Sequence, residues 1–406
     1  MGNNISKKNK NNSDSHNQKK ENIAKFIKCS NNKSNNNNKI KETKEFKNIN
    51  MNNNKVENKN LKDKISEVMN KEERTNFNSN TINYKFIRNI ATDSYSYGVD
   101  NTMVAFKSID DILFFIYSNV KCSIISYNLI DNKKINEIKK GHNSRITNLR
   151  HYLDKGKNQD LIISASLDNN LKLWTINNWE CFLNIERIYE KGEMLSACFL
   201  ILNNQIYILT SNTDYFKIIE PIKVFNLKGI KVKEINHSSD EINIIDVYYE
   251  KNSSKPYILT GSNGFVQSFD YNKNKIYHIY NDKDKKSHLS LMVKKENKLI
   301  QLIESSEDIN IRIWNFHTGQ LLKKIYISNE TLYGICLWNN AYLLAGCNDN
   351  TIKIVDIEKS KIIGNIIGHN RMVLVLAKID IPNYGECLIS QENGELTKLW
   401  KIKFNI

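Results

Sequence analysis

The sequence predicts an all-β fold made of seven repeated units, preceded by a disordered N-terminal arm. Three observations support this prediction. The first 80 residues are poor in apolar and aromatic side chains. From about residue 84 onward the chain repeats itself, and each repeat consists of short β-rich runs. Polar turns rich in asparagine, aspartate and glycine separate these runs, which is typical of antiparallel strands and not of helices.

Residues 1–80 are expected to stay outside the core. They contain 18 Lys and Arg against 9 Asp and Glu, and their aromatic side chains are Phe26, Phe46 and Phe77. Such a stretch buries too little apolar surface to offset the entropy of ordering it. It carries +9 of the net charge of +15, so the rest of the chain carries only +6. Because the excess charge lies on an arm and not on a folded face, nucleic acid is not an expected partner. We divide the chain into this arm and a repeated domain, residues 81–406.

The repeats are most regular at the third β-rich run of each unit. In the good copies a polar turn connects two strands, with the short length that an antiparallel hairpin prefers. The following strand alternates, so that Leu171 and Leu173 point to one face and Lys172 and Trp174 to the other. The third runs end at Tyr127, Trp174, Phe225, Phe269, Trp314, Val355 and Trp400, which lie 47, 51, 44, 45, 41 and 45 residues apart.

Four of these units resemble WD repeats, the blades of a β-propeller. The copies are SASLDNNLKLW, SSEDINIRIWN, AGCNDNTIKIVD and SQENGELTKLW, and the pairs Gly141-His142 and Gly368-His369 open two units. The resemblance covers roughly four fifths of the chain and implies a seven-bladed ring. Physical reasoning leads to the same ring, since a small four-stranded sheet has two apolar faces and must stack against a neighbour on each side.

Closure of the ring requires one more strand. After Trp400 only the six residues KIKFNI remain, too few for a turn and an outer strand. The run YKFIRNI, Tyr84 to Ile90, precedes the first unit and belongs to none of the seven. We expect it to complete the last blade, which removes the open edges that would promote aggregation.

In the WD family a histidine, a serine or threonine, an aspartate and a tryptophan form a hydrogen-bonded chain that stiffens a blade. The resemblance places the full set in the second unit, at His142, Ser164, Asp168 and Trp174. The last unit retains three of the four residues but has Gly394 where the aspartate is expected. We interpret these residues as structural, because a buried polar group needs a partner whatever the protein does.

The sequence contains no recognisable catalytic chemistry. The motifs H-E-x-x-H, G-x-x-x-x-G-K-[ST] and G-x-S-x-G are absent, the eight histidines are scattered, and the seven cysteines form no C-x-x-C pair. We therefore expect a non-enzymatic protein without metal or cofactor. The unpaired cysteines and the absence of a secretory signal indicate a reducing compartment, and no apolar run approaches the ~18 residues of a spanning helix.

The N-terminus MGNNIS has the pattern of an acylation signal. Gly2 becomes the first residue once Met1 is removed, and Ser6 stands at the fifth mature position. A myristoyl chain alone binds membranes only marginally, so a second signal is needed. The basic residues Lys7, Lys8 and Lys10 supply it by attraction to anionic lipid. The alternative is that glycine and serine occur here by chance in a tail rich in asparagine and lysine.

Two further features of the arm have more than one interpretation. Cys29, which follows Phe26 and Ile27, is a candidate for a second acyl chain or simply a free thiol. Residues 55–74 place apolar side chains at helical spacing. A helix there is similar to the one that precedes the propeller in heterotrimeric G-protein β subunits and pairs with a small partner. It could instead pack on the propeller or remain a linker.

The third unit contains a polar insertion between Ser211 and Pro221. Its two aromatic residues, Tyr215 and Phe216, follow Asp214 and are the candidate interface for a partner protein, because aromatic anchors among polar residues often form the centre of an interface. The alternative is that both rings fill the core of the third blade.

These observations predict a propeller that binds other proteins and is held peripherally on the cytoplasmic face of a membrane by its arm. The alternative is a soluble cytosolic or nuclear propeller that forms part of a larger complex. This alternative has three forms: a ubiquitin-ligase substrate receptor, a signalling protein similar to a G-protein β subunit, and a subunit of an RNA-processing assembly. Since propellers have many unrelated functions, the fold alone does not choose between these two interpretations.

Overall fold

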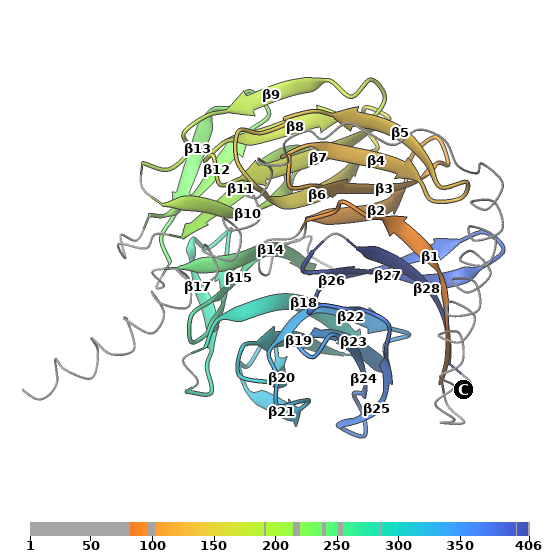
Figure 1. Cartoon of the computed structure of the whole chain (residues 1–406). Coiled ribbons are helices and arrows are strands. Elements are labelled where there is room, and N and C mark those ends of the chain that lie inside the picture. The colour runs from red at the N-terminus through yellow and green to blue at the C-terminus, as the bar shows by residue number, and fades with distance from the viewer. Residues whose placement is uncertain are drawn as a thin grey trace, which may run out of the picture. The chain divides into compact units, whose positions relative to one another are not determined.

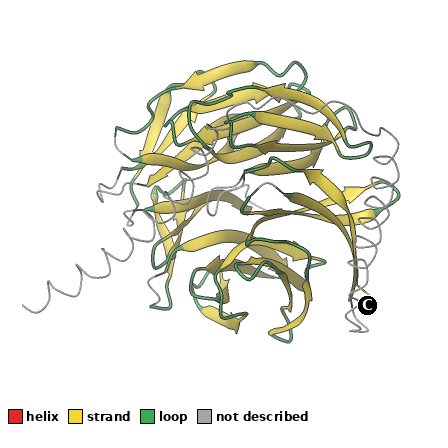
Figure 2. Cartoon of the chain, in the orientation of Figure 1, coloured by secondary structure: helices red, strands yellow, loops and turns green. Residues whose placement is uncertain are grey.

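A computed structural model describes residues 82–95, 102–190, 192–213, 220–237, 241–250, 255–283, 286–296, 298–394 and 396–404. Within these ranges the chain forms 28 strands and no helix (Figure 2). The strands make seven antiparallel sheets of four strands each. The prediction of an all-β, seven-bladed propeller is therefore confirmed.

Six blades are continuous in sequence, and we number them from 1 to 6. Blade 1 contains β2 (Met103–Lys107), β3 (Leu113–Ser118), β4 (Ile124–Asn128) and β5 (Lys133–Ile138). Blade 2 contains β6 (Ile146–Asp154), β7 (Gln159–Ser166), β8 (Leu171–Thr175) and β9 (Cys181–Ile185). Blade 3 contains β10 (Glu193–Leu202), β11 (Gln205–Thr213), β12 (Ile222–Asn226) and β13 (Lys231–Ile235).

The next three blades repeat the arrangement. Blade 4 contains β14 (Ile242–Glu250), β15 (Lys255–Ser262), β16 (Val266–Asp270) and β17 (Lys275–Tyr280). Blade 5 contains β18 (His288–Glu296), β19 (Leu299–Ser306), β20 (Asn310–Asn315) and β21 (Leu321–Tyr326). Blade 6 contains β22 (Leu332–Trp338), β23 (Tyr342–Cys347), β24 (Ile352–Asp356) and β25 (Lys361–Ile366).

Blade 7 joins the two ends of the described chain. It contains β26 (Val373–Ile381), β27 (Gly385–Glu392), β28 (Thr397–Phe404) and, as its outer strand, β1 (Ile82–Ala91). β1 runs antiparallel to β28, with Ile82 opposite Phe404. The expectation that the run from Tyr84 to Ile90 closes the ring is therefore confirmed.

The first strands of the blades lie closest to the centre of the ring (Figure 1). Each of these strands contacts the first strand of the next blade, and β2 contacts β26, so the circle is complete. The third strands contain the aromatic or valine residues that define the sequence repeat. Because the strands of a blade alternate in direction, their connections gather at two opposite ends of the ring.

We call these two ends the AB face and the BC face. The AB face carries the turns between first and second strands and between third and fourth strands, such as residues 155–158 and 176–180 of blade 2. The BC face carries the turns between second and third strands, such as residues 167–170, and the connections to the next blade. β1 begins beside the end of β28, so Ile82 lies at the AB face.

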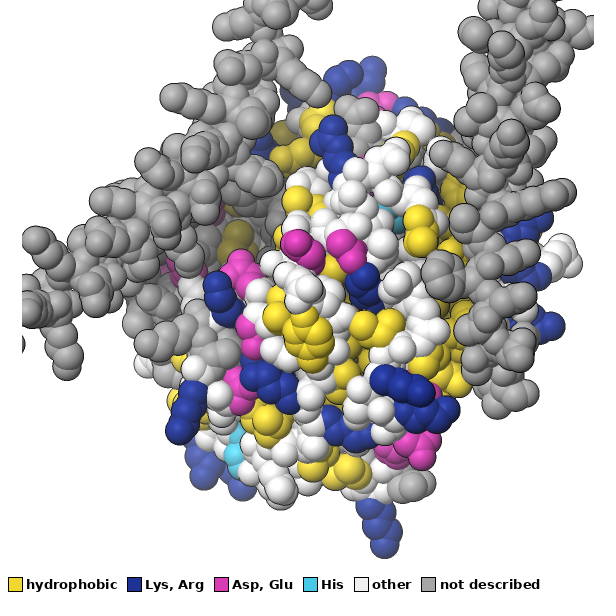
Figure 3. All heavy atoms as spheres, turned by 60° about the horizontal axis from the view of Figure 1, so that its bottom comes forward, with side chains coloured by type: hydrophobic (Ala, Val, Ile, Leu, Met, Phe, Trp, Pro, Cys, Tyr) yellow, Lys and Arg dark blue, Asp and Glu magenta, His cyan; other side chains and the backbone are white. Residues whose placement is uncertain are grey.

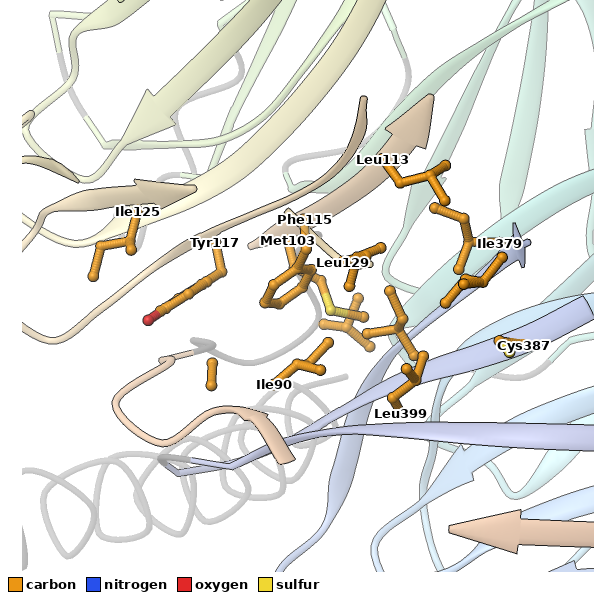
Figure 4. Packing of buried hydrophobic residues seen from close by; sticks show 14 of the residues in the cluster. Ile90, Met103, Leu113, Phe115, Tyr117, Ile125, Leu129, Ile379, Cys387 and Leu399 are labelled. Atoms are coloured by element: carbon orange, nitrogen blue, oxygen red, sulfur yellow. The ribbon is translucent and has the colours of Figure 1, made fainter. Parts of the chain in front are cut away.

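The hydrophobic core consists of seven clusters, each between two neighbouring blades. Leu171 and Leu173 face blade 3, whereas Trp174 faces blade 1, as the alternation predicts. Figure 4 shows the cluster that joins blade 7 to blade 1, with Phe115 fully buried among side chains from both. Complete burial of one such side chain contributes about 1.5–3 kcal/mol. The ring is therefore stabilised mainly between its blades.

Blades 6 and 7 approach so closely that only glycine fits at their contact. A Cβ atom on Gly346 of β23 would lie 2.4 Å from the carbonyl oxygen of Val373 in β26. A Cβ on Gly334 of β22 would lie 2.6 Å from the carbonyl oxygen of Leu374. Neither contact is sterically allowed, and neighbouring backbone cannot move away cheaply.

The outer strands of the ring expose single apolar side chains. Leu322 and Tyr326 of β21 and Ile362 of β25 are among them. In Figure 3, where the bottom of Figure 1 comes forward, apolar side chains lie among lysine, arginine and acidic side chains. Lysines on outer strands discourage pairing with the edge of another sheet.

Candidate functional site

The histidine, serine, aspartate and tryptophan of blade 2 form one hydrogen-bonded chain. His142 precedes β6, Ser164 lies in β7, Asp168 lies in the following turn and Trp174 lies in β8. Trp174 Nε1 donates to Ser164 Oγ at 2.8 Å, and Ser164 Oγ lies 2.7 Å from His142 Nε2. His142 Nδ1 lies 3.2 Å from the Asp168 carboxylate. Since an ionised carboxylate only accepts, Nδ1 carries the proton and Nε2 accepts from the serine hydroxyl.

This chain holds a carboxylate in its ionised form. Burial raises the pKa of Asp168, but the hydrogen bonds from His142 and from the backbone N–H groups of Asn143 and Asn170 outweigh burial, so the pKa is about 2. The turn of blade 2 is therefore tied to the segment that enters the blade. His142 and Ser164 are both buried, and the polar atoms of the set bond to one another and to nearby backbone N–H groups.

Blade 7 has the same chain with a different carboxylate. His369 Nε2 lies 2.6 Å from Ser390 Oγ, and Trp400 Nε1 donates to the same oxygen at 2.7 Å. Glu392 Oε2 lies 2.9 Å from His369 Nδ1, the position that Asp168 occupies in blade 2. This blade therefore has a carboxylate at its histidine although Gly394 stands where the family has its aspartate. Glutamate is one methylene longer, so from two residues earlier it reaches the same histidine nitrogen.

The pKa values within blade 7 agree with this pairing. Burial raises the pKa of Glu392, but hydrogen bonds from His369 and from the backbone N–H of Asn370 outweigh it and lower the pKa below its ordinary value. Burial lowers the pKa of His369, and Glu392 opposes that effect. The pair is therefore a neutral histidine that donates to an ionised carboxylate.

Blade 5 replaces the serine with a glutamate. Glu304 of β19 stands ten residues before Trp314, as Ser164 stands before Trp174. His288 Nδ1 lies 2.7 Å from Glu304 Oε2, and Trp314 Nε1 donates to Glu304 Oε1 at 3.4 Å. The sequence analysis treated His288 only as one of several scattered histidines. The 16 residues between His288 and Glu304 differ from the 22 between His142 and Ser164, so the histidine spacing gave no signal, and only the ten-residue spacing of Glu304 and Trp314 matched.

Arg312 of β20 is fully buried beside this pair and holds several carboxylates. Its Nε donates to Asp282 Oδ2 at 2.7 Å, and its Nη1 donates to Asp308 Oδ1 at 3.0 Å. Nη1 also lies 3.5 Å from Glu304 Oε1. Burial raises the pKa of Asp308, but its bonds to Arg312 and Ser306 outweigh this and lower it. Blade 5 thus contains a buried ionic network centred on an arginine.

In several blades a lysine or arginine lies two residues before the aromatic position of the third strand. The expectations from sequence did not include this recurrence. Lys172 donates to the carbonyl oxygen of Gly141 at 2.7 Å, and Lys223 donates to that of Ile188 at 2.8 Å. Lys398 contacts the carbonyl oxygen of Gly368 in the same way. Each cation ties a third strand to the connection from the preceding blade. The repeated letters KLW, KVF, RIW and KIV were the available signal.

The centre of the ring contains a cavity of about 390 Å³. Six of the first strands line it, mainly with apolar side chains such as Val104 and Met292. Arg150 and Asp246 are the charged residues of this lining. No group of three or more histidine, cysteine, aspartate or glutamate side chains suited to a metal occurs in the described part of the chain.

The remaining predicted site residues lie outside the described residues. Cys29, the segment 55–74, Tyr215 and Phe216 belong to this group, as do Gly2 and the lysines Lys7, Lys8 and Lys10. The polar insertion connects the end of β11 to the start of β12, both of which lie at the BC face. The other six cysteines form no disulfide in the structure. The described residues include no helix with the length and hydropathy required to cross a membrane.

Comparisons with known proteins agree with this fold. Residues 133–175, which span β5 to β8, match the family described as WD domain, G-beta repeat. A stretch of 101 residues is 23% identical to the U3 small nucleolar RNA-associated protein 21 homolog of Schizosaccharomyces pombe, and it covers 25% of this chain and 11% of that protein. With seven blades closed into a ring, the chain is a WD-repeat β-propeller protein.

Proposed function

We propose that this propeller is a protein-interaction scaffold held on the cytoplasmic face of a membrane by an N-terminal acyl chain and a basic arm. The observation that carries the proposal is the pattern of Gly2 and Ser6 followed by Lys7, Lys8 and Lys10. One acyl chain and one basic run are the two signals that stable anchoring needs. The propeller supplies the scaffold, because a rigid ring displays loops from seven blades at once.

The partner-binding loops of this scaffold are proposed to lie on the BC face. The insertion with Tyr215 and Phe216 connects strands that meet there, and it is the longest connection between a second and a third strand. Aromatic side chains among polar residues are typical anchors of an interface. Tyr215→Ala and Phe216→Ala should lose captured partners at an unchanged melting temperature. A lowered melting temperature would place both rings in the core instead.

The experiment that tests the anchor is intact mass analysis of the mature N-terminus, followed by fractionation. Wild-type protein should carry the mass of a myristoyl group on Gly2 and should sediment with membranes. Gly2→Ala should lack this mass and move to the soluble fraction, because lysines near anionic lipid contribute only about 1 kcal/mol each. A mature N-terminus without the acyl mass would contradict the proposal, and so would an unchanged membrane fraction of the variant.

A second candidate function is a subunit of a nuclear RNA-processing assembly. The observation that favours it is the partial similarity to a protein whose name associates it with U3 small nucleolar RNA. Imaging of the tagged full chain distinguishes the two candidates. Signal at a membrane that Gly2→Ala removes supports the scaffold, whereas nucleolar signal that is unchanged in Gly2→Ala supports the RNA-processing subunit.

A further inference from the structure

The AB face of blades 2 to 5 carries a group of exposed lysines. Six of them lie in the turns and strand ends of four consecutive blades and are exposed. None of the six forms a direct ion pair with another described residue, although the charge of Lys273 helps to lower the pKa of Asp270. They are Lys155 and Lys157 of blade 2, Lys228 of blade 3, Lys273 and Lys275 of blade 4, and Lys298 of blade 5. A set of positive charges on one end of a ring attracts anionic surfaces.

The carboxylates on the same face of these blades are already engaged. Asp154 Oδ1 accepts the backbone N–H groups of Gly156 and Lys157. Asp160 is buried and lies 2.6 Å from His151 Nε2. Three more carboxylates have cationic or amide partners: Asp270 with Lys255 at 2.8 Å, Glu296 with Lys294 at 3.0 Å, and Glu180 with Asn178 at 2.8 Å. Asp270 and Glu296 are thus paired with lysines other than these six, whereas Asp154 and Glu180 keep their negative charge beside neutral partners.

Exposed apolar side chains stand beside these lysines. Ile230 is 57% exposed and follows Lys228 and Gly229 in the turn that leads to β13. Ile276 is 40% exposed and follows Lys275 at the start of β17. Ile130 of blade 1 lies in the equivalent turn and is 53% exposed. Surfaces that bind at a lipid interface combine lysines, which contact the headgroups, with apolar side chains such as isoleucine, which enter the acyl boundary.

The described chain also begins at this face. Ile82 pairs with Phe404 at the AB end of blade 7, so the segment that precedes Ile82 joins the ring there. An anchor near the N-terminus is therefore connected to the end of the ring that bears these six lysines. The BC face, with the connection between β11 and β12, lies at the opposite end.

We propose that the AB face rests on an anionic lipid bilayer, which leaves the BC face directed away from the membrane. This inference rests on the proposed membrane function and adds an orientation to it. A bilayer is favoured over RNA for two reasons. The lysines are spread over four blades on one flat end, where a planar surface contacts all of them together. The adjacent isoleucines also find an apolar medium in lipid, which a nucleic acid backbone does not offer.

Vesicle sedimentation with two matched variants tests the proposal. All proteins are full-length chains that carry Gly2→Ala, so that no acyl chain contributes. The AB variant replaces Lys157, Lys228, Lys273 and Lys275 with glutamine. The control variant replaces Lys121, Lys139, Lys140 and Lys283, exposed lysines near the BC face, with glutamine. Both variants lose four charges, and both are first compared with the parent protein by thermal melting.

The vesicles contain phosphatidylcholine alone or with about 30 mol% phosphatidylserine. On anionic vesicles we expect the AB variant to bind at least about tenfold more weakly than the parent and the control variant to bind within about threefold of it. Equal losses in the two variants would overturn the proposal. Absence of parent binding to anionic vesicles, or equal binding to neutral ones, would also overturn it.

A second version of the experiment replaces the vesicles with RNA, which is the competing ligand. If a labelled single-stranded RNA binds the parent and not the AB variant, while vesicle binding is the same for both, the face is an RNA surface and the proposal is wrong. The vesicle and RNA results do not depend on N-terminal acylation, because every protein in the experiment carries Gly2→Ala. A mature N-terminus without acyl mass would therefore remove the proposed anchor but leave the vesicle result to decide the role of the face.

Discussion

Phe86 packs edge-on against Trp400, with 5.4 Å between the ring centroids. The two residues lie near opposite ends of the chain, on β1 and β28. Trp400 also belongs to the hydrogen-bonded chain of blade 7, since its indole N–H donates to Ser390. The strand that closes the ring is thus packed on the same side chain that anchors the polar set of the last blade. Ring closure and blade stiffness are coupled at this residue.

Deletion of β1, residues 82–91, should destabilise the protein far more than deletion of residues 11–50. The first deletion exposes the edge of β28 and the apolar side chains that β1 covers, including Trp400. The second removes only residues that the sequence places outside the core. Thermal melts of the two truncated proteins check this prediction. Equal melting temperatures would show that β1 does not close the ring in solution.

Glu392→Ala should lower the free energy of unfolding by about 1–3 kcal/mol at neutral pH, because His369 and the backbone N–H of Asn370 lose their acceptor inside the protein. Glu392→Gln, which retains an oxygen acceptor, should cost less. Glu358→Ala removes an exposed glutamate and serves as the control. Urea unfolding measures all three, and equal values for Glu392→Ala and the control would be inconsistent with a structural carboxylate.

The contribution of Asp168 to stability should depend on pH. Its pKa is about 2 in the folded protein, below the ordinary value of 3.8. The unfolded chain therefore binds this proton more readily, so the stabilisation is present above about pH 4 and is lost as the pH falls toward 2. Wild-type protein should exceed Asp168→Asn by about 2 kcal/mol at pH 7, and the difference should shrink at pH 3. Urea melts at both pH values test this, and a difference that does not change with pH would refute it.

Arg312→Met should cost about 3–5 kcal/mol, since it leaves Asp282, Asp308 and Glu304 without the guanidinium that neutralises them in the interior. Lys172→Met at the equivalent position of blade 2 should cost only about 1 kcal/mol, because it releases one backbone carbonyl oxygen. Chemical unfolding of the two variants provides the comparison. Similar losses would mean that the ionic network of blade 5 contributes no more than a single hydrogen bond.

Much of the fold was predictable from local patterns. The third strands follow from aromatic residues at a regular spacing, and the alternation of Leu171 and Trp174 assigns them to different blade interfaces. The strand from Tyr84 to Ile90 could be assigned to blade 7 because every blade needs four strands and the last unit had only three. Such inferences depend on repetition and strand count, which are properties of the sequence itself.

Other features were decided only in three dimensions. Glu392 replaces an aspartate expected at Gly394 because a longer side chain reaches the same histidine from another position, and spacing rules do not include reach. Arg312 is buried because Asp282 and Asp308, from two separate connections, converge on it. The exposed lysines of the AB face became a surface only when antiparallel strands brought the turns of four blades to one end. Sequence thus determined the repeat, the strands and the alternation of side chains, since these are local. Tertiary structure alone decided which distant charges meet and which remain without a partner, because that depends on packing between segments far apart in the chain.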